Sequence, residues 1–100
     1  MKRIMALGEV GGLPGGGCNR LALTDADRDG RNLVVAWMRD LNMNVAIDVV
    51  GNIVGTWQVG TGAPVMTGSH IDTVRTGGLY DGNYGVLAGL EVLRALDEAG

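Results

Sequence analysis

The chain has 100 residues, with 8 Lys and Arg, 11 Asp and Glu and one His, which gives a formal net charge of −3. Nucleic acids and anionic membrane surfaces attract clustered basic residues, and the only adjacent basic pair here is Lys2-Arg3, so the charge argues against both partners. No apolar run approaches the roughly 18 to 20 residues that span a bilayer, and the single Cys18 excludes an internal disulfide framework. We therefore expect a cytoplasmic α/β protein with no nucleic-acid partner and no membrane partner.

The N-terminal part contains a loop followed by a helix. Residues 11–17 are too rich in glycine for regular structure. No Lys-Ser/Thr pair follows them, which argues against a phosphate-binding loop, so we expect a mobile loop there. Thr24 is a good N-cap that Asp27 can answer in a capping box. Apolar residues then recur at a spacing of four, which predicts an amphipathic helix over residues 25–41 with Trp37 and Met38 in the core.

Strand patterns and a second helix follow. Residues 45–49 and 53–57 flank a Gly51-Asn52 turn, which predicts a β-hairpin. Residues 64–69 form a short, mostly apolar run that is typical of a buried strand. Apolar residues at three- and four-residue steps predict a second helix over 83–99. The order helix, hairpin, strand, helix, without an interdomain linker, indicates one α/β domain.

Residues that could perform chemistry gather between positions 68 and 85. His70 and Asp72 lie two positions apart at the C-terminal end of the predicted buried strand, where an extended backbone would point both side chains to one side. Asp72 could then orient the imidazole of a metal-bound His70. Asp81 follows, and Gly82 and Gly85 leave room for a ligand or metal to approach the backbone. An imidazole with a carboxylate suits Zn, Mn, Co or Ni better than Ca or Mg.

Each of these residues also has a simpler explanation. A lone His is more often a hydrogen-bonded interior or surface residue than a metal ligand. Asp81 before a helix could be an N-cap, and Asp72 followed by Thr73 could make a turn. Zinc centres usually take three or four protein ligands, and this chain has no second His. The spacing alone leaves both explanations open.

The same region resembles a known family. Residues 68–74 (Gly-Ser-His-Ile-Asp-Thr-Val), 77–82 (Gly-Gly-Leu-Tyr-Asp-Gly) and 85–93 (Gly-Val-Leu-Ala-Gly-Leu-Glu-Val-Leu) closely resemble motifs of the hydantoinase/carbamoylase family of dinuclear-metal amidohydrolases. Residues 20–25 and 48–53 resemble the segments that precede these motifs in the family. The family includes N-carbamoyl-L-amino acid hydrolases, β-ureidopropionases and allantoate amidohydrolases.

The resemblance implies a fold and a set of roles. The fold would be the N-terminal portion of a zinc-aminopeptidase-like α/β/α catalytic domain. His70 would bind one of two divalent metal ions (Zn, Mn, Co or Ni), Asp72 would orient His70 without binding metal, and Asp81 would bridge both ions. The substrate would be a small molecule with a linear amide C–N bond of the carbamoyl, ureido or allantoate type. A lid domain elsewhere in the full-length protein would make it a homodimer.

Several parts of the family's machinery have no counterpart in residues 1–100. The general-base Glu, a neighbouring ligand Glu and two further His ligands of the family would all lie downstream of Gly100, as would the lid domain. We therefore expect an N-terminal fragment of the catalytic domain, inactive by itself and poorly folded because an apolar sheet edge would lack its neighbours. Two alternatives remain: an aminoacylase- or aminopeptidase-like member of the same superfamily, and a non-catalytic truncated remnant.

Overall fold

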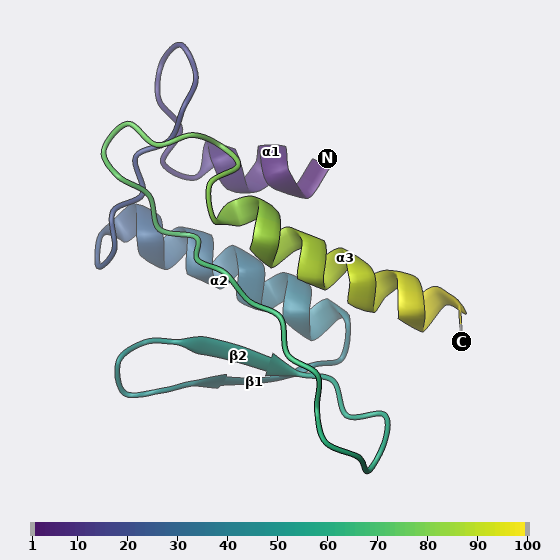
Figure 1. Ribbon diagram of the computed structural model, residues 1–100. Helices are drawn as coiled ribbons and strands as arrows, with labels where there is room; N and C mark the ends of the chain where they lie inside the picture. Colours follow the sequence, from purple (N-terminus) through teal and green to yellow (C-terminus); the bar gives the residue numbers. More distant parts are fainter. Residues whose placement is uncertain (1, 100) are drawn as a thin grey trace.

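The computed structural model describes residues 2–99 and contains three helices and one two-stranded sheet in that range (Figure 1). In chain order the elements are α1 (Lys2–Glu9), α2 (Asp25–Asp40), β1 (Asn44–Ile47), β2 (Ile53–Thr56) and α3 (Asn83–Ala99). Strands β1 and β2 pair antiparallel, with Asn44 opposite Thr56 and Ile47 opposite Ile53. The protein is therefore a mixed helix and sheet structure, as predicted, and its sheet is a hairpin.

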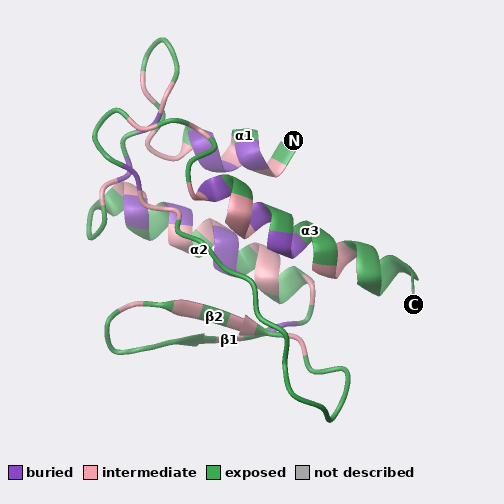
Figure 2. Cartoon of the chain, viewed as in Figure 1, coloured by how far each residue is buried: buried purple, intermediate pink, exposed green. Residues whose placement is uncertain are grey.

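The core lies where the three helices face one another. Helix α1 packs beside α3, and the hairpin packs against α2 (Figure 1). Most of the buried residues belong to the helices, whereas the hairpin and the long connection after it are mostly exposed (Figure 2). Trp37 and Met38 pack against this core, as predicted, but they remain partly exposed. The buried cluster consists of Ile4, Leu7, Val34, Met43, Leu87 and Leu90.

The local signals in the sequence correspond to observed elements. The helix predicted over 25–41 is α2, and the helix predicted over 83–99 is α3. Thr24 caps α2, because its Oγ1 accepts from the Asp27 N–H at 3.3 Å. The Asp27 carboxylate does not return the bond to Thr24, however. It accepts from the Leu23 N–H at 3.0 Å, one residue further out.

Helix α1 was not predicted, and its sequence shows why. Eight residues are too few for a helix that is stable by itself. Ile4 and Leu7 lie three positions apart, so both face the core, where they are buried against α3. The helix therefore depends on tertiary packing that local sequence patterns do not report.

The buried strand predicted over residues 64–69 is wrong for the described structure. Residues 61–70 are all exposed and have no strand assignment, and Val65 and Met66 are 100% and 80% exposed. The segment runs without a hydrogen-bonded strand beside it in residues 2–99. A short apolar run forms a strand only when neighbouring strands supply the backbone hydrogen bonds, and within residues 2–99 the only paired strands are β1 and β2. None of the described helices is both long and apolar enough to cross a membrane.

Candidate metal centre

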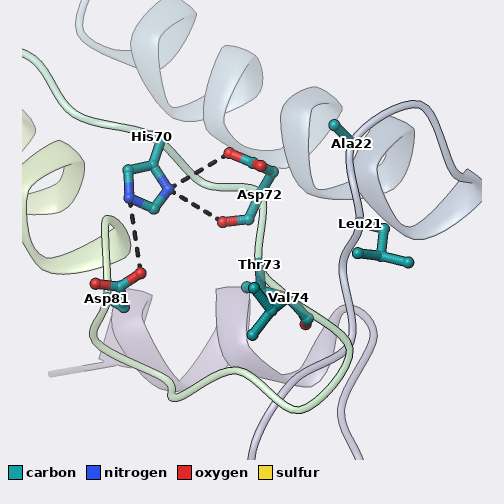
Figure 3. A pocket seen from close by; sticks show the side chains of 7 residues that line it. All are labelled: Leu21, Ala22, His70, Asp72, Thr73, Val74 and Asp81. Carbon is teal, nitrogen blue, oxygen red and sulfur yellow. Dashed lines mark hydrogen bonds and ion pairs between the residues drawn. The ribbon is translucent and has the colours of Figure 1, made fainter.

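The imidazole of His70 stands between two carboxylates (Figure 3). His70 Nδ1 lies 3.1 Å from the backbone oxygen of Asp72 and 3.4 Å from its Oδ1. His70 Nε2 lies on the opposite side of the ring, 3.7 Å from Asp81 Oδ2. The structure thus brings together the three residues that the sequence singled out, and Asp72 and Asp81 face different ring nitrogens.

The contact at Nδ1 indicates which ring nitrogen of His70 carries a hydrogen. A backbone carbonyl can only accept, so the Asp72 oxygen pairs with a hydrogen on Nδ1. A neutral imidazole with its hydrogen on Nδ1 has a lone pair on Nε2, and that lone pair faces the Asp81 carboxylate. Two electron-rich atoms that face each other in this way favour a cation or a proton between them.

The spacing of these two atoms suits a metal ion. Ligand atoms about 2.0 to 2.2 Å from a tetrahedral zinc lie roughly 3.4 Å apart. The 3.7 Å between His70 Nε2 and Asp81 Oδ2 is close to that separation. The donor set therefore fits a borderline metal such as zinc, with Asp72 behind the imidazole as the orienting group.

The site is open to solvent. The side chains of His70 and Asp72 are 53% and 48% exposed, and that of Asp81 is 82% exposed. Residues 2–99 contain no group of three or more His, Cys, Asp or Glu side chains placed to hold a metal, so this part of the chain offers at most two ligands. A pocket of about 490 Å³ lies at this site. Its lining residues, shown in Figure 3, are Leu21, Ala22, His70, Asp72, Thr73, Val74 and Asp81.

The simpler explanations for the two carboxylates are not observed. Helix α3 begins at Asn83, and within residues 2–99 no backbone N–H donates to the carboxylate of Asp81. The Asp72 carboxylate likewise accepts from no backbone N–H of the described chain and faces His70 instead. Asp81 lies in the turn before α3, where its backbone oxygen accepts from the Asn83 N–H at 2.8 Å, but neither carboxylate caps the helix or closes a turn. Both carboxylates therefore remain available to the site.

Residues 67–73, the site segment, lie close to α3 because this helix and the residue before it contain glycines. A Cβ on Gly82, whose φ is +71°, would lie 2.5 Å from His70 Nδ1 and Cε1. A Cβ on Gly85 would lie 2.8 Å from Ser69 Cβ, and one on Gly89 would lie 2.9 Å from Thr67 Cγ2. The space at Gly82 and Gly85 was predicted to admit a ligand or metal, but His70 and Ser69 occupy it. The two glycines therefore allow His70 to lie close to the start of α3.

Arg20 holds the site segment from the other side, and sequence reasoning gave it no role. Arg20 Nε donates to the oxygen of Ile71 at 2.7 Å, and the Arg20 N–H donates to Thr73 Oγ1 at 2.6 Å. The Thr73 N–H donates back to the oxygen of Arg20 at 2.7 Å. These contacts bridge more than 50 positions of sequence. The only signal for Arg20 was that it opens the segment 20–25 that resembles the family.

Known proteins match the chain along nearly its whole length. An N-carbamoyl-L-amino acid amidohydrolase of Geobacillus stearothermophilus is 43% identical over 102 residues, which cover 99% of this chain and 25% of that protein. An allantoate amidohydrolase of Bacillus subtilis is 41% identical over 95 residues, covering 92% of this chain and 23% of that protein. No family model matches the chain.

The fold is also similar to that of solved structures. A hydantoinase/carbamoylase family amidase from Burkholderia ambifaria superposes with a TM-score of 0.95 at 48% identity, over 99% of this chain and 25% of that one. The chain therefore spans about a quarter of the length of the proteins that it matches.

Proposed function

We propose that this chain carries part of the metal site of an amidohydrolase. Its whole length is similar to a segment that makes up about a quarter of hydantoinase/carbamoylase family amidases. The observation that supports the proposal most directly is the position of His70. Its Nδ1 faces Asp72 and its Nε2 faces Asp81, so the ring is oriented on one side and can bind on the other.

Each of the three residues has one proposed role. His70 binds one of two divalent ions (Zn, Mn, Co or Ni) through Nε2. Asp72 accepts the hydrogen of Nδ1, which keeps the lone pair on Nε2 and holds the ring in place. Asp81 has two carboxylate oxygens and can bridge both ions. When bound, the ions would polarise the substrate carbonyl and would lower the pKa of bound water, which would make hydroxide available at neutral pH.

The proposed reaction is hydrolysis of a linear amide C–N bond in a small carbamoyl, ureido or allantoate-type substrate. Water adds to the carbonyl carbon, the C–N bond breaks, and the released nitrogen takes up a proton. A carbamoyl substrate then yields ammonia, carbon dioxide and the amine. The proposal is supported by the relatives, which include an N-carbamoyl-L-amino acid amidohydrolase and an allantoate amidohydrolase.

The remaining machinery is proposed to lie outside these 100 residues. It comprises a general-base Glu, further Glu and His ligands and a lid that forms a homodimer. The complete catalytic domain is proposed to have a zinc-aminopeptidase-like α/β/α fold, in a cytoplasmic enzyme. The intact mass of the protein from its source, compared with 10.4 kDa, tests whether other residues complete it.

The decisive experiment uses the complete polypeptide as its source produces it. The protein is stripped of metal, reloaded with Zn, Mn or Co, and assayed with N-carbamoyl amino acids, allantoate and N-acyl amino acids. His70→Ala and Asp81→Asn are expected to abolish turnover and to lower the amount of bound metal. Asp72→Asn is expected to lower metal affinity or turnover by about 10- to 100-fold, as is usual for groups that orient a ligand.

Asp97→Asn is the matched control, because Asp97 is an exposed carboxylate near the end of α3. It should leave both metal content and turnover unchanged. Full turnover and full metal content in His70→Ala would refute the proposal. Turnover of N-acyl amino acids alone would instead identify the aminoacylase-like alternative.

A further inference from the structure

Arg20 is a fully buried cation that has no carboxylate partner among the described residues. Its relative exposure is 0%, and no Asp or Glu of residues 2–99 forms an ion pair with it. All three guanidinium nitrogens nevertheless donate hydrogen bonds. Nη1 donates to the oxygens of Leu7 and Val10, each at 2.7 Å, and Nη2 donates to Asn83 Oδ1 at 2.9 Å. Nε donates to the oxygen of Ile71 at 2.7 Å.

The carbonyl acceptors explain how the charge is tolerated. Leu7 lies in the last turn of α1 and Val10 directly follows the helix, so both carbonyls lie at the end that carries the partial negative charge of the helix dipole. A guanidinium is planar and presents five N–H donors in a fixed fork, so it can bind acceptors in several directions at once. One side chain thereby joins α1, α3 and the site segment.

Helix α2 has a glycine at the point where this side chain passes. A Cβ on Gly30 would lie 2.7 Å from Arg20 Cδ and 3.2 Å from Arg20 Nε. Glycine is a poor helix former, yet Gly30 is an interior residue of α2. The position therefore gives up helix propensity to make room for the arginine, which is a second observation independent of the hydrogen bonds.

Arg20 contacts the residues on both sides of Asp72. Its side chain binds Ile71, and its backbone binds Thr73 through two hydrogen bonds. Asp72 lies between these two residues, and both its backbone oxygen and its carboxylate face His70 Nδ1. The backbone at Asp72 thus cannot shift without breaking a contact to Arg20.

We propose that Arg20 is a positioning residue for the metal centre: it holds Asp72, and through Asp72 the ring of His70, in the geometry that binds metal. The inference rests on the proposed function. The inference goes beyond the proposed function because it assigns a role to a side chain that is not a metal ligand and is not proposed to contact the substrate. Loss of the guanidinium should leave both ligands in the chain but loosen the segment that carries them.

The test compares Arg20→Met and Arg20→Lys with the unaltered protein, each as the complete polypeptide. Two readouts do not depend on turnover: Zn²⁺ affinity by chelator competition, corrected for the folded fraction, and hydrogen exchange of metal-free protein measured on peptides. Arg20→Met should weaken Zn²⁺ binding by about tenfold or more. It should speed exchange in residues 70–74 and leave the hairpin, residues 44–56, unchanged.

Arg20→Lys keeps the positive charge but replaces the fork with one ammonium group, so it should not restore Zn²⁺ affinity. Arg28→Met is the matched control, because Arg28 lies on α2 with its side chain 66% exposed, and it should behave as the unaltered protein. Full Zn²⁺ affinity in Arg20→Met, or faster exchange spread evenly over the chain, would overturn the proposal.

Gly30→Ala covers the case in which Arg20→Met does not fold. It keeps Arg20 and improves helix propensity, but its Cβ displaces the arginine stem. It should weaken Zn²⁺ binding several-fold and speed exchange in residues 70–74, whereas Gly62→Ala, at a position with no atom within 4 Å, should do neither. Unchanged binding and exchange in Gly30→Ala would refute the role of Arg20. If instead His70→Ala binds Zn²⁺ as the unaltered protein does, the proposed function fails, and the exchange data still decide whether Arg20 holds the segment.

Discussion

Two stretches without regular structure, the turn at residues 48–52 and the site segment at residues 67–73, are stabilised by different kinds of contact. In the turn, Asp48 Oδ1 accepts from the N–H groups of Val50 and Asn52 at 3.0 and 2.9 Å, and its Oδ2 accepts from Asn52 Nδ2 at 2.8 Å. All these partners lie within four positions. The site segment is bound by Arg20, more than 50 positions away, and packs against glycines at the start of α3.

The difference separates what depends on local sequence from what depends on the whole fold. The turn needs only five consecutive residues to adopt its shape. The site segment takes its shape only after the loop that precedes α2 and the start of α3 have packed around it, and closing such long loops costs chain entropy. Changes in distant elements should therefore loosen the site and spare the turn.

The largest effect on stability is expected at Gly82. Its left-handed φ of +71° would cost an alanine about 1–2 kcal/mol. The overlap of the new Cβ with His70 would add about 1–3 kcal/mol. Gly82→Ala should lower the free energy of unfolding by the sum of these costs and displace His70, as measured by chemical denaturation and by Zn²⁺ affinity.

Gly62→Ala is the control for this change, since no atom lies within 4 Å of that position. If Gly82→Ala speeds hydrogen exchange in the hairpin as much as in residues 70–73, the site and the turn do not respond independently, and the comparison is wrong. Hydrogen exchange on the two peptides distinguishes these results.

A smaller effect on the free energy of unfolding is expected at Gly85, and its sign should depend on the residue at position 69. Alanine improves helix propensity by about 1 kcal/mol, but its Cβ would lie 2.8 Å from Ser69 Cβ. In the natural background we expect Gly85→Ala to destabilise the protein by about 1 kcal/mol, because overpacking costs about 1–3 kcal/mol. In a Ser69→Gly background the clash is gone, and the same substitution should stabilise. A double-mutant cycle measures the coupling; a coupling near zero would show that α3 and the site segment do not constrain each other.

The parts of the fold that were predicted correctly are those with local causes. Helix α2 has Thr24 as its cap and a four-residue apolar spacing, and the hairpin has a glycine turn. The resemblance to the hydantoinase/carbamoylase family, which began from His70, Asp72 and Asp81, is confirmed by the relatives and by the solved structures. The structure also brings these three residues together, while their roles at a metal stay predictions.

The parts that were missed have distant causes. Helix α1 exists because Ile4 and Leu7 pack against α3. Residues 64–69 have the composition of a strand but no neighbouring strand in the described chain. A buried Arg20 without a carboxylate partner cannot be recognised from its neighbours in sequence, since its acceptors come from residues 7, 10, 71 and 83.

The smallest effect is expected at Asp48, and it tests the local side of the comparison. Hydrogen bonds from Asn52 to its carboxylate lower the pKa of Asp48 below the ordinary value of 3.8. A carboxyl whose pKa is lowered in the folded state stabilises that state above its unfolded pKa, and this contribution is lost as the pH falls through the folded value. Because Asp48 is exposed, solvent screens the interaction and the contribution is small.

Asp48→Ala should therefore lower the melting temperature slightly at neutral pH, and the difference from the unaltered protein should vanish as the pH falls below about 3.8. Hydrogen exchange should speed up only within residues 44–56, with Zn²⁺ affinity unchanged, because the side-chain hydrogen bonds of Asp48 within the described residues go only to Val50 and Asn52. A loss of Zn²⁺ affinity in Asp48→Ala would mean that turn and site are coupled through α2. The conclusion that the turn is stabilised only by local contacts, independently of the site, would then be wrong.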